Sequence, residues 1–186
     1  MAKIEILSVN SFKLAWRDKG SGADMDGAFY NPINIPIGFN AIGSYGQGNY
    51  STPTGSILVV KEIESGTLAY PVDFKLIYND KGSGADMDGS FWEPIPPKGY
   101  VAMGILCVHG YNEPAKSSVV CLRSDLVVPA TVGRLIWDDK GSGADMDGGF
   151  WDISTVGSIQ TGAFAGASNY HSSDAAPLFG INHSVI

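Results

Sequence analysis

One ten-residue segment that occurs three times constrains the fold of this chain more than any other feature of its sequence. The three copies of DKGSGADMDG occupy residues 18–27, 80–89 and 139–148. Their flanks also correspond, because FKLAW, FKLIY and GRLIW precede the copies, and AFY, SFW and GFW follow them. Repetition of this kind indicates one supersecondary unit that packs against copies of itself. We place the three units at about residues 10–70, 71–130 and 131–186.

Each unit is expected to contain four short strands. In the second unit FKLIY is rich in β-forming residues, the acidic loop turns the chain back into SFW, and VAMGILCV and SVVCL supply two more strands. No segment has an apolar period of 3.6 residues, so we expect almost no helix. A unit of this size cannot bury its own apolar face, so residues 1–186 should form a single domain.

The expected fold is an all-β, threefold pseudo-symmetric β-prism of about twelve strands in three four-stranded sheets. A β-propeller typically has four or more blades, and the units of a β-trefoil are usually shorter than these. Residues 3–9, KIEILSV, correspond to the runs that precede the later units. We expect this strand to complete the third sheet and close the prism.

The charge of the chain is concentrated in the three repeated loops. Each copy holds three Asp and one Lys, a net charge of −2, so the copies account for −6 of the total of −7. Such loops repel phosphate backbones and anionic lipid head groups unless a cation lies between them. The sequence contains no basic stripe, and we therefore expect no nucleic-acid partner.

The N-terminal residues MAKIEILSVN lack the long apolar run of a secretory signal. We expect synthesis in the cytosol without a signal peptide, and leave open release from the cell and action outside it. Cys107 and Cys121 are the only cysteines. They are either two separate buried thiols or, if their strands pair as a hairpin, close neighbours. Whether they form a disulfide is left undecided.

The aspartates of each loop are candidate metal ligands. Asp24 and Asp26 are two residues apart and lie on one face of an extended segment, and the hairpin could bring Asp18 beside them. Three carboxylates plus backbone carbonyls suit Ca²⁺, which takes about six to eight oxygen ligands. The spacing is neither that of an EF-hand nor that of the calcium-binding nonapeptide. The predicted ligands are Asp18, Asp24, Asp26, Asp80, Asp86, Asp88, Asp139, Asp145 and Asp147.

The loops are also candidate contacts for an organic ligand such as a sugar. Their glycines expose backbone N–H and C=O groups, and an aromatic residue after each loop offers a stacking platform. The predicted contacts are Gly20, Ser21, Gly22, Gly82, Ser83, Gly84, Gly141, Ser142, Gly143, Tyr30, Trp92 and Trp151. Two structural alternatives stay open. In one alternative the aromatic rings are core residues. In the other the Asp and Gly residues only stabilise tight turns.

An enzymatic function is not expected. His109, His171 and His183 do not recur between the units, and no nucleophile-elbow or phosphate-loop sequence is present. Paired aspartates serve as acid and base in glycoside hydrolysis. Three identical sites on one small domain nevertheless suit multivalent binding better than catalysis.

The loop and its downstream flank resemble a known family. The pattern D-x-G-S-G-A-x-x-D-x-x-F-W-x-P-I, followed by P-x-G-Y-x-A-x-G, resembles the vacuolar-protein-sorting β-prism repeats of fungi and plants. It is also similar to the multivesicular-body-associated β-prism and to β-prism modules of some bacterial perforin-like toxins. The second unit carries the pattern at Asp80, Gly82, Ser83, Gly84, Ala85, Asp88, Phe91, Trp92, Pro94, Ile95, Gly99, Tyr100 and Gly104. The first unit has Tyr30 in place of the tryptophan, and the third keeps Trp151 but lacks the proline.

The resemblance implies a β-prism that works at membranes or on surface ligands. Together with the loops it predicts a non-enzymatic, lectin-like protein that binds a cell-surface glycan or a membrane lipid head group with the help of Ca²⁺. The alternatives are an insecticidal or pore-forming toxin, a module that targets one, and a structural sorting scaffold. A homo-oligomer or a partner toxin subunit would be needed for pore formation.

Overall fold

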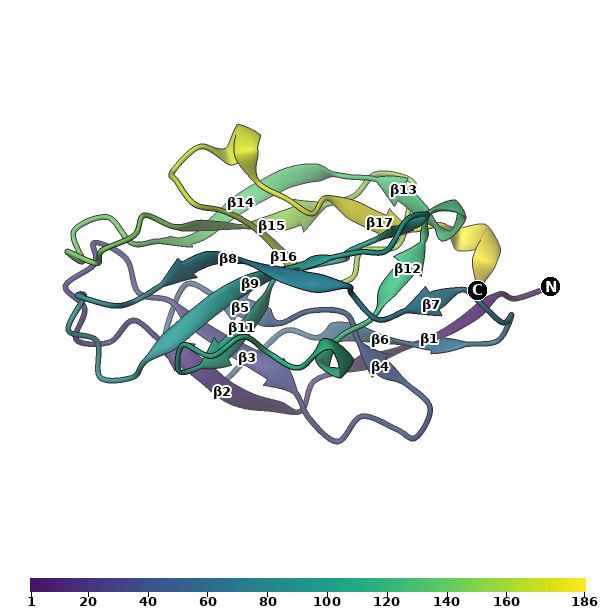
Figure 1. Ribbon diagram of the computed structural model, residues 1–186, viewed down its shortest axis with the longest axis horizontal. Helices are drawn as coiled ribbons and strands as arrows, with labels where there is room; N and C mark the ends of the chain where they lie inside the picture. Colours follow the sequence, from purple (N-terminus) through teal and green to yellow (C-terminus); the bar gives the residue numbers. More distant parts are fainter.

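The computed structural model describes all residues, 1–186, and is built almost entirely of β-strands (Figure 1). Helical structure is limited to four 3₁₀ turns of three residues each, at Lys116–Ser118, Ser124–Leu126, Ser172–Asp174 and His183–Val185. The expected all-β class with almost no helix is therefore confirmed. None of these turns is long and apolar enough to cross a membrane.

The structure has seventeen strands rather than twelve, because several expected strands are bent and divide into two pieces. The first unit contains β1 (Ile4–Val9), β2 (Phe12–Arg17), β3 (Ala28–Pro32), β4 (Asn40–Ala41), β5 (Tyr45–Gln47) and β6 (Ile57–Glu62). The second contains β7 (Leu68–Ala69), β8 (Asp73–Asn79), β9 (Gly89–Ile95), β10 (Tyr100–Val101), β11 (Leu106–His109) and β12 (Cys121–Arg123). The third contains β13 (Val127–Pro129), β14 (Thr131–Asp138), β15 (Gly149–Ser154), β16 (Phe164–Ala167) and β17 (Phe179–Ile181). In the structure the second and third units begin with β7 and β13, a few residues before the predicted bounds.

The strands form two sets of small antiparallel sheets that recur with the units. Next to the acidic loops lie three sheets of three strands, in the orders β2-β3-β5, β8-β9-β11 and β14-β15-β16. In each of them the acidic loop connects the first strand to the central one. Toward the chain termini lie the sheets β1-β6-β4, β7-β12-β10 and β13-β17.

The prediction that residues 3–9 close the third sheet is wrong. Strand β1 pairs with β6 in a continuous register from Ile4↔Glu62 to Val9↔Ile57. The reason is local, because β1 and β2 are two parts of one bent segment and both pair with strands of the first unit. Residues 3–9 touch the third unit through a hydrogen bond from Lys3 N to Val185 O, 2.8 Å long, and through Ile4, which lies in one core cluster with Ile181 and Val185.

A shared aromatic core joins the three units next to the loops. The strand before each loop has a register irregularity just before its last aromatic residue, and such bulges re-aim a side chain. The fully buried rings of this core are Trp16, Tyr78, Trp137, Phe29, Phe91, Phe150 and Phe164. Rings from different units touch, with centroids 4.8 Å apart for Phe29–Phe91 and 4.2 Å apart for Phe91–Phe150. Each unit buries its rings against the other two, which explains why they form one core.

A second, aliphatic core fills the opposite half of the molecule. It contains residues of all three units, including Ile4, Met103, Leu122 and Ile181. Cys107 and Cys121 are both buried and both free, on β11 and β12 of two different sheets. The three acidic loops lie together at one end of the molecule, and the N- and C-termini lie at the other (Figure 1). We call the former the acidic end, defined by residues 18–27, 80–89 and 139–148.

Candidate functional site

The first aspartate of each loop fastens the loop rather than facing solvent. Asp18 is buried, its Oδ1 accepts a hydrogen bond from the Gly27 amide at 2.8 Å, and its backbone N donates to Gly27 O at 3.1 Å. Ser21 Oγ donates to Asp18 Oδ2 at 3.3 Å and accepts from the Ala23 amide at 3.1 Å. The same closure links Asp80 to Gly89 and Asp139 to Gly148.

The other two aspartates of each loop are exposed. Along the segment Ala23–Asp26 the side chains alternate, so that Ala23 and Met25 pack against the aromatic core and Asp24 and Asp26 face outward. The prediction that these two aspartates share a face is therefore confirmed, and the period-two pattern of an extended chain is the reason. The exposed carboxylates of the acidic end are Asp24, Asp26, Asp86, Asp88, Asp145 and Asp147.

The three loops contact one another in a closed ring. The Asp24 amide donates to Lys140 O, the Asp86 amide donates to Lys19 O, and the Asp145 amide donates to Lys81 O, each over 2.8 Å. Every loop therefore donates to one neighbour and accepts from the other. This is a head-to-tail contact that closes after three copies.

The first glycine of each loop is required by this ring. Gly20 has φ +89°, and a Cβ on it would lie 2.8 Å from Asp86 Oδ1 of the neighbouring loop. Equivalent approaches of 2.7 Å and 2.6 Å are found for Gly82 against Asp145 Oδ1 and for Gly141 against Asp24 Oδ1. An L-residue would be strained by the backbone and would displace the aspartate.

The ring gives a structural reason for the identity of the three loops. Each loop uses one surface to donate and another to accept, so a substitution in one copy must fit two neighbours at once. Aromatic anchors beneath the ring add a further constraint, because Trp16 Nε1 donates to Met87 O at 3.0 Å and Trp137 Nε1 to Met25 O at 3.1 Å. The alternative that the loops have a structural role therefore has direct support.

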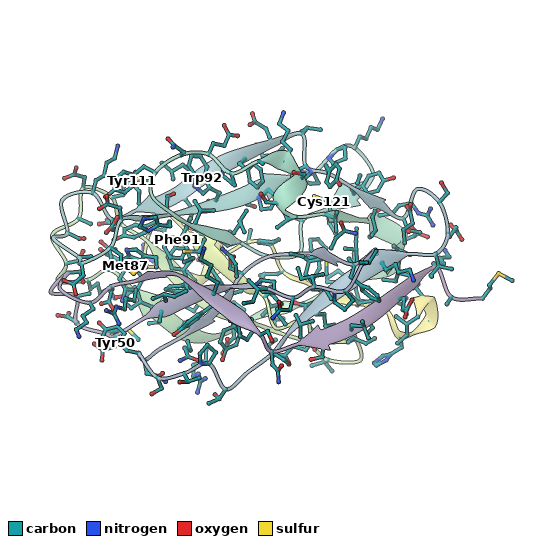
Figure 2. The ribbon with its side chains drawn as sticks, turned by 90° about the horizontal axis from the view of Figure 1, so that it is seen from below. Tyr50, Met87, Phe91, Trp92, Tyr111 and Cys121 are labelled. Atoms are coloured by element: carbon teal, nitrogen blue, oxygen red, sulfur yellow. The ribbon has the colours of Figure 1, made fainter.

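A tyrosine from later in each unit reaches the loop, and sequence reasoning missed it. Tyr50 OH donates to Asp18 Oδ1 at 2.6 Å, Tyr111 OH to Asp88 Oδ1 at 3.1 Å, and Tyr170 OH to Asp147 Oδ1 at 3.0 Å. Figure 2 shows Tyr50 and Tyr111 on either side of Met87, with Phe91 deeper in the interior. The signal was present in the sequence, since GNY, HGY and SNY end the downstream part of the three units.

The environment keeps these tyrosines protonated. Burial raises the pKa of Tyr50, Tyr111 and Tyr170 well above the usual value, and hydrogen bonding to the nearby aspartates raises it further. Lys81 Nζ and Lys140 Nζ each lie 4.9 Å from the ring centroid of Tyr111 and Tyr170, within range of a cation–π attraction. The tyrosines thus act as fixed donors that orient the acidic residues.

Metal binding by the three carboxylates of one loop stays a prediction. No group of three or more His, Cys, Asp or Glu side chains is arranged to hold a metal ion. The physical reason is that Asp18, Asp80 and Asp139 are buried as acceptors for the loop backbone, and the following two aspartates of each loop face solvent. Calcium binding itself stays a prediction, and the donors available for it are the six exposed carboxylates.

The residues predicted as an aromatic platform are mostly covered. Tyr30 and Trp151 are buried, as the core alternative predicts, and the rings of Tyr30 and Phe12 are 6.2 Å apart. Trp92 is half-buried and donates from Nε1 to Ser90 Oγ at 2.9 Å. The second glycine of each loop is exposed and has a positive φ, so its backbone is open to solvent. These residues are Gly22, Gly84 and Gly143.

Comparison with known proteins identifies the family. The model of the family Vps62, vacuolar protein sorting-associated protein 62, matches residues 1–176. The chain belongs to the Vps62 family. The resemblance to vacuolar-protein-sorting repeats is therefore confirmed for nearly the whole chain. No curated protein matches this Vps62-family sequence.

A solved structure has the same fold. The crystal structure of GNIP1Aa from Chromobacterium piscinae superposes on this Vps62-family chain with a TM-score of 0.85 and 29% sequence identity. The match covers 98% of this chain but only 38% of GNIP1Aa. The fold described here is thus part of a longer chain in that protein.

Proposed function

We propose that this Vps62-family chain is a non-enzymatic recognition module whose acidic end binds a component of a cell surface or membrane. The observation that carries the proposal is the closed ring of three identical loops, which gathers six exposed carboxylates at the end of the molecule opposite the termini. Three equivalent contacts increase avidity on a surface where the ligand is dense.

The rigidity of the loops supports a binding role. Each loop is closed by its own buried aspartate, bonded to a neighbouring loop, and anchored on the aromatic core through its alanine and methionine. A site that is already ordered loses little conformational entropy when a ligand binds. In this proposal the six small sheets together make up a threefold β-prism, and its loop end is the binding surface.

The ligand is a glycan or a lipid head group, and Ca²⁺ assists its binding. The exposed carboxylates are hard oxygen donors of the type that Ca²⁺ prefers. A net charge of −6 in the loops repels an anionic head group, and a divalent cation between them turns that repulsion into attraction. The buried aspartates Asp18, Asp80 and Asp139 are left out of the proposed ligand set, because they hold the loops closed.

A second candidate is a targeting module within a larger assembly, including a toxin. The observation in its favour is that the matching part of GNIP1Aa is 38% of that chain, so the same fold is joined there to further protein. The two candidates share the binding step. They differ in whether binding leads to membrane damage.

Binding to vesicles tests the proposal. Vesicles of phosphatidylcholine with and without phosphatidylserine, and a glycan array, are incubated with the protein in Ca²⁺ or in chelator. The triple variant Asp24→Asn, Asp86→Asn and Asp145→Asn keeps the backbone bonds of the ring and removes three exposed charges. We expect it to lose at least ten-fold in affinity.

The matched control is the triple variant Glu5→Gln, Glu64→Gln and Asp73→Asn, which removes the same charge outside the acidic end. It should bind as the wild type does. An equal loss of affinity in both variants would mean that only net charge matters, and it would overturn the proposal. The absence of binding to every vesicle and glycan would also overturn it. Leakage of a dye from the vesicles supports the toxin candidate, and binding without leakage contradicts it.

A further inference from the structure

The junction between the first and third units contains a polar pocket of about 430 Å³. One wall comes from β5 and the residues after it, including Gly46 and Gly48. The other comes from β14 and β15 and carries Arg134 and Asp152. The other two junctions also hold pockets, of about 220 Å³ and about 510 Å³, but their linings are mainly apolar. We call the junction of the first and third units, with its polar pocket, the open junction.

At the other two junctions a side chain forms a bridge between the units. Between the first and second units, Asn31 Nδ2 donates to Cys107 O at 2.8 Å. Between the second and third units, Ser168 Oγ donates to Ile77 O at 2.8 Å. Both bridges join the edge strand after a loop, β11 or β16, to the sheet of the neighbouring unit.

The corresponding residues at the open junction cannot form either bridge. Asp152 stands in the position of Asn31 and, as a carboxylate, has no hydrogen to donate to Gly46 O. Gly48 stands in the position of Ser168, and a Cβ on it would lie 3.1 Å from Ile136 O, the carbonyl equivalent to that of Ile77. The second unit has Glu93 at the position of Asn31 and His109 at the position of Ser168, so each of the other junctions has one bridge and the open junction has neither.

The two charged groups of the pocket are only weakly engaged with each other, whereas Gln47 is hydrogen-bonded to Tyr45 and Asn49. Asp152 Oδ2 lies 3.8 Å from Arg134 Nε, longer than a hydrogen bond, and the Arg134 side chain is 88% exposed. Burial raises the pKa of Asp152, and Arg134 opposes this effect only in part. A carboxylate in this state gains from a ligand that donates hydrogen bonds to it.

The lining indicates the chemical class of the ligand. Asp152 disfavours an anion, and Arg134 disfavours a cation, whereas both bind neutral hydroxyl groups. Met25, Tyr45 and Leu135 add apolar surface of the kind that contacts the C–H face of a ring. We propose that this junction is a single binding pocket for a neutral polyhydroxylated ring, such as one hexose unit of a glycan.

The number of bound sugars per chain distinguishes this proposal from binding at the acidic end. A junction pocket that contains both an arginine and a carboxylate occurs once, and the loops occur three times. Titration calorimetry with glucose, galactose, mannose and N-acetylglucosamine, in chelator, should give one site per chain for at least one of these sugars. Amide NMR shifts should then be concentrated at residues 46–49 and 152, away from residues 80–89.

Two variants rebuild the closed form of the junction. Gly48→Ser restores the hydroxyl found at Ser168, and Asp152→Asn restores the amide found at Asn31. Each should reduce sugar affinity at least ten-fold. Asp152→Asn should also leave the melting temperature unchanged or raised, which distinguishes closure from unfolding. His109→Ser, at the equivalent position of the second unit, is the matched control and should bind normally.

Unchanged sugar affinity in both closing variants would overturn the proposal. So would binding of three sugars per chain, which would assign the sugar to the acidic loops, or no binding of any of the four sugars to the wild-type protein. Loss of vesicle binding by the Asp24, Asp86 and Asp145 variant leaves the pocket unaffected, so the two proposals fail independently.

Discussion

The amide of Asp24, the seventh residue of the first loop, donates a hydrogen bond to the carbonyl oxygen of Lys140, the second residue of the third loop. The same bond is made twice more around the acidic end, with the loops exchanging roles each time. Because every loop is both donor and acceptor, the ring imposes one sequence on three places. The close approach of neighbouring loops accounts directly for the first glycine of each copy, Gly20, Gly82 and Gly141.

The ring predicts that the glycines of one loop differ in their tolerance of a side chain. Gly141 and Gly143 both have positive φ, but only at Gly141 would a Cβ meet the neighbouring loop, at Asp24 Oδ1. We expect Gly143→Ala to lower the free energy of unfolding by about 1–2 kcal/mol from backbone strain alone. Gly141→Ala should cost about 1 kcal/mol more, because Asp24 must move. Urea unfolding measures both.

A double-mutant cycle isolates the loop-to-loop contact. Asp24→Ala should recover part of the loss caused by Gly141→Ala and none of the loss caused by Gly143→Ala, since only the first pair is in contact. Equal costs for the two glycine variants, or no coupling in the cycle, would mean that the contact does not constrain the loop.

Features that follow from local periodicity could be predicted from the sequence. Contacts that form only when the three units pack together could not. Alternation along Ala23–Asp26 correctly placed two aspartates on one face, and the hairpin at each loop follows from its glycines. The position of Asp24 beside Gly141 depends on which loop neighbours which, and no local pattern contains that information. The burial of Asp18 was missed for a related reason, since its partners Gly27 and Tyr50 come together only when the unit folds.

Tyr78 departs from the repeat in a way that predicts a neutral substitution. The tryptophans at the equivalent positions donate to a methionine carbonyl of the next loop, whereas the hydroxyl of Tyr78 is buried without a hydrogen-bond partner. Tyr78→Phe removes a group whose burial is unfavourable, so the free energy of unfolding should change by less than about 1 kcal/mol or rise. Trp16→Phe, which loses a made bond and buried volume, should cost about 2–4 kcal/mol. Thermal unfolding of the two variants compares them, and equal losses would contradict the assignment.

Asp152 predicts a dependence of stability on pH that its amide variant lacks. Burial raises its pKa above the ordinary value of 3.8, so the native state holds this proton more tightly than the unfolded chain does. The resulting stabilisation is complete below the unfolded pKa and is lost as the pH rises through the native pKa. The stability of Asp152→Asn relative to the wild type should therefore increase from pH 4 toward pH 7.

At pH 7 the side-chain amide of Asp152→Asn can also donate a hydrogen bond to the neighbouring unit. Such a bond contributes about 1 kcal/mol to the free energy of unfolding. Urea unfolding at several pH values measures the difference, and Glu5→Gln, which removes one exposed carboxylate, is the control. A difference between Asp152→Asn and the wild type that stays constant with pH would contradict the role assigned to this carboxylate.

Calcium should bind to the acidic end without the buried aspartates. Calorimetric titration of chelator-treated protein is expected to show equivalent sites, one per loop, and a raised melting temperature, because a ligand of the native state stabilises it. The triple variant at Asp24, Asp86 and Asp145 should lose this heat and this shift. Asp18→Asn should instead lower the melting temperature in chelator, because the Gly27 amide and the Tyr50 hydroxyl lose a charged acceptor. If the wild-type protein gives neither heat nor shift, the prediction of calcium binding at the acidic end is wrong.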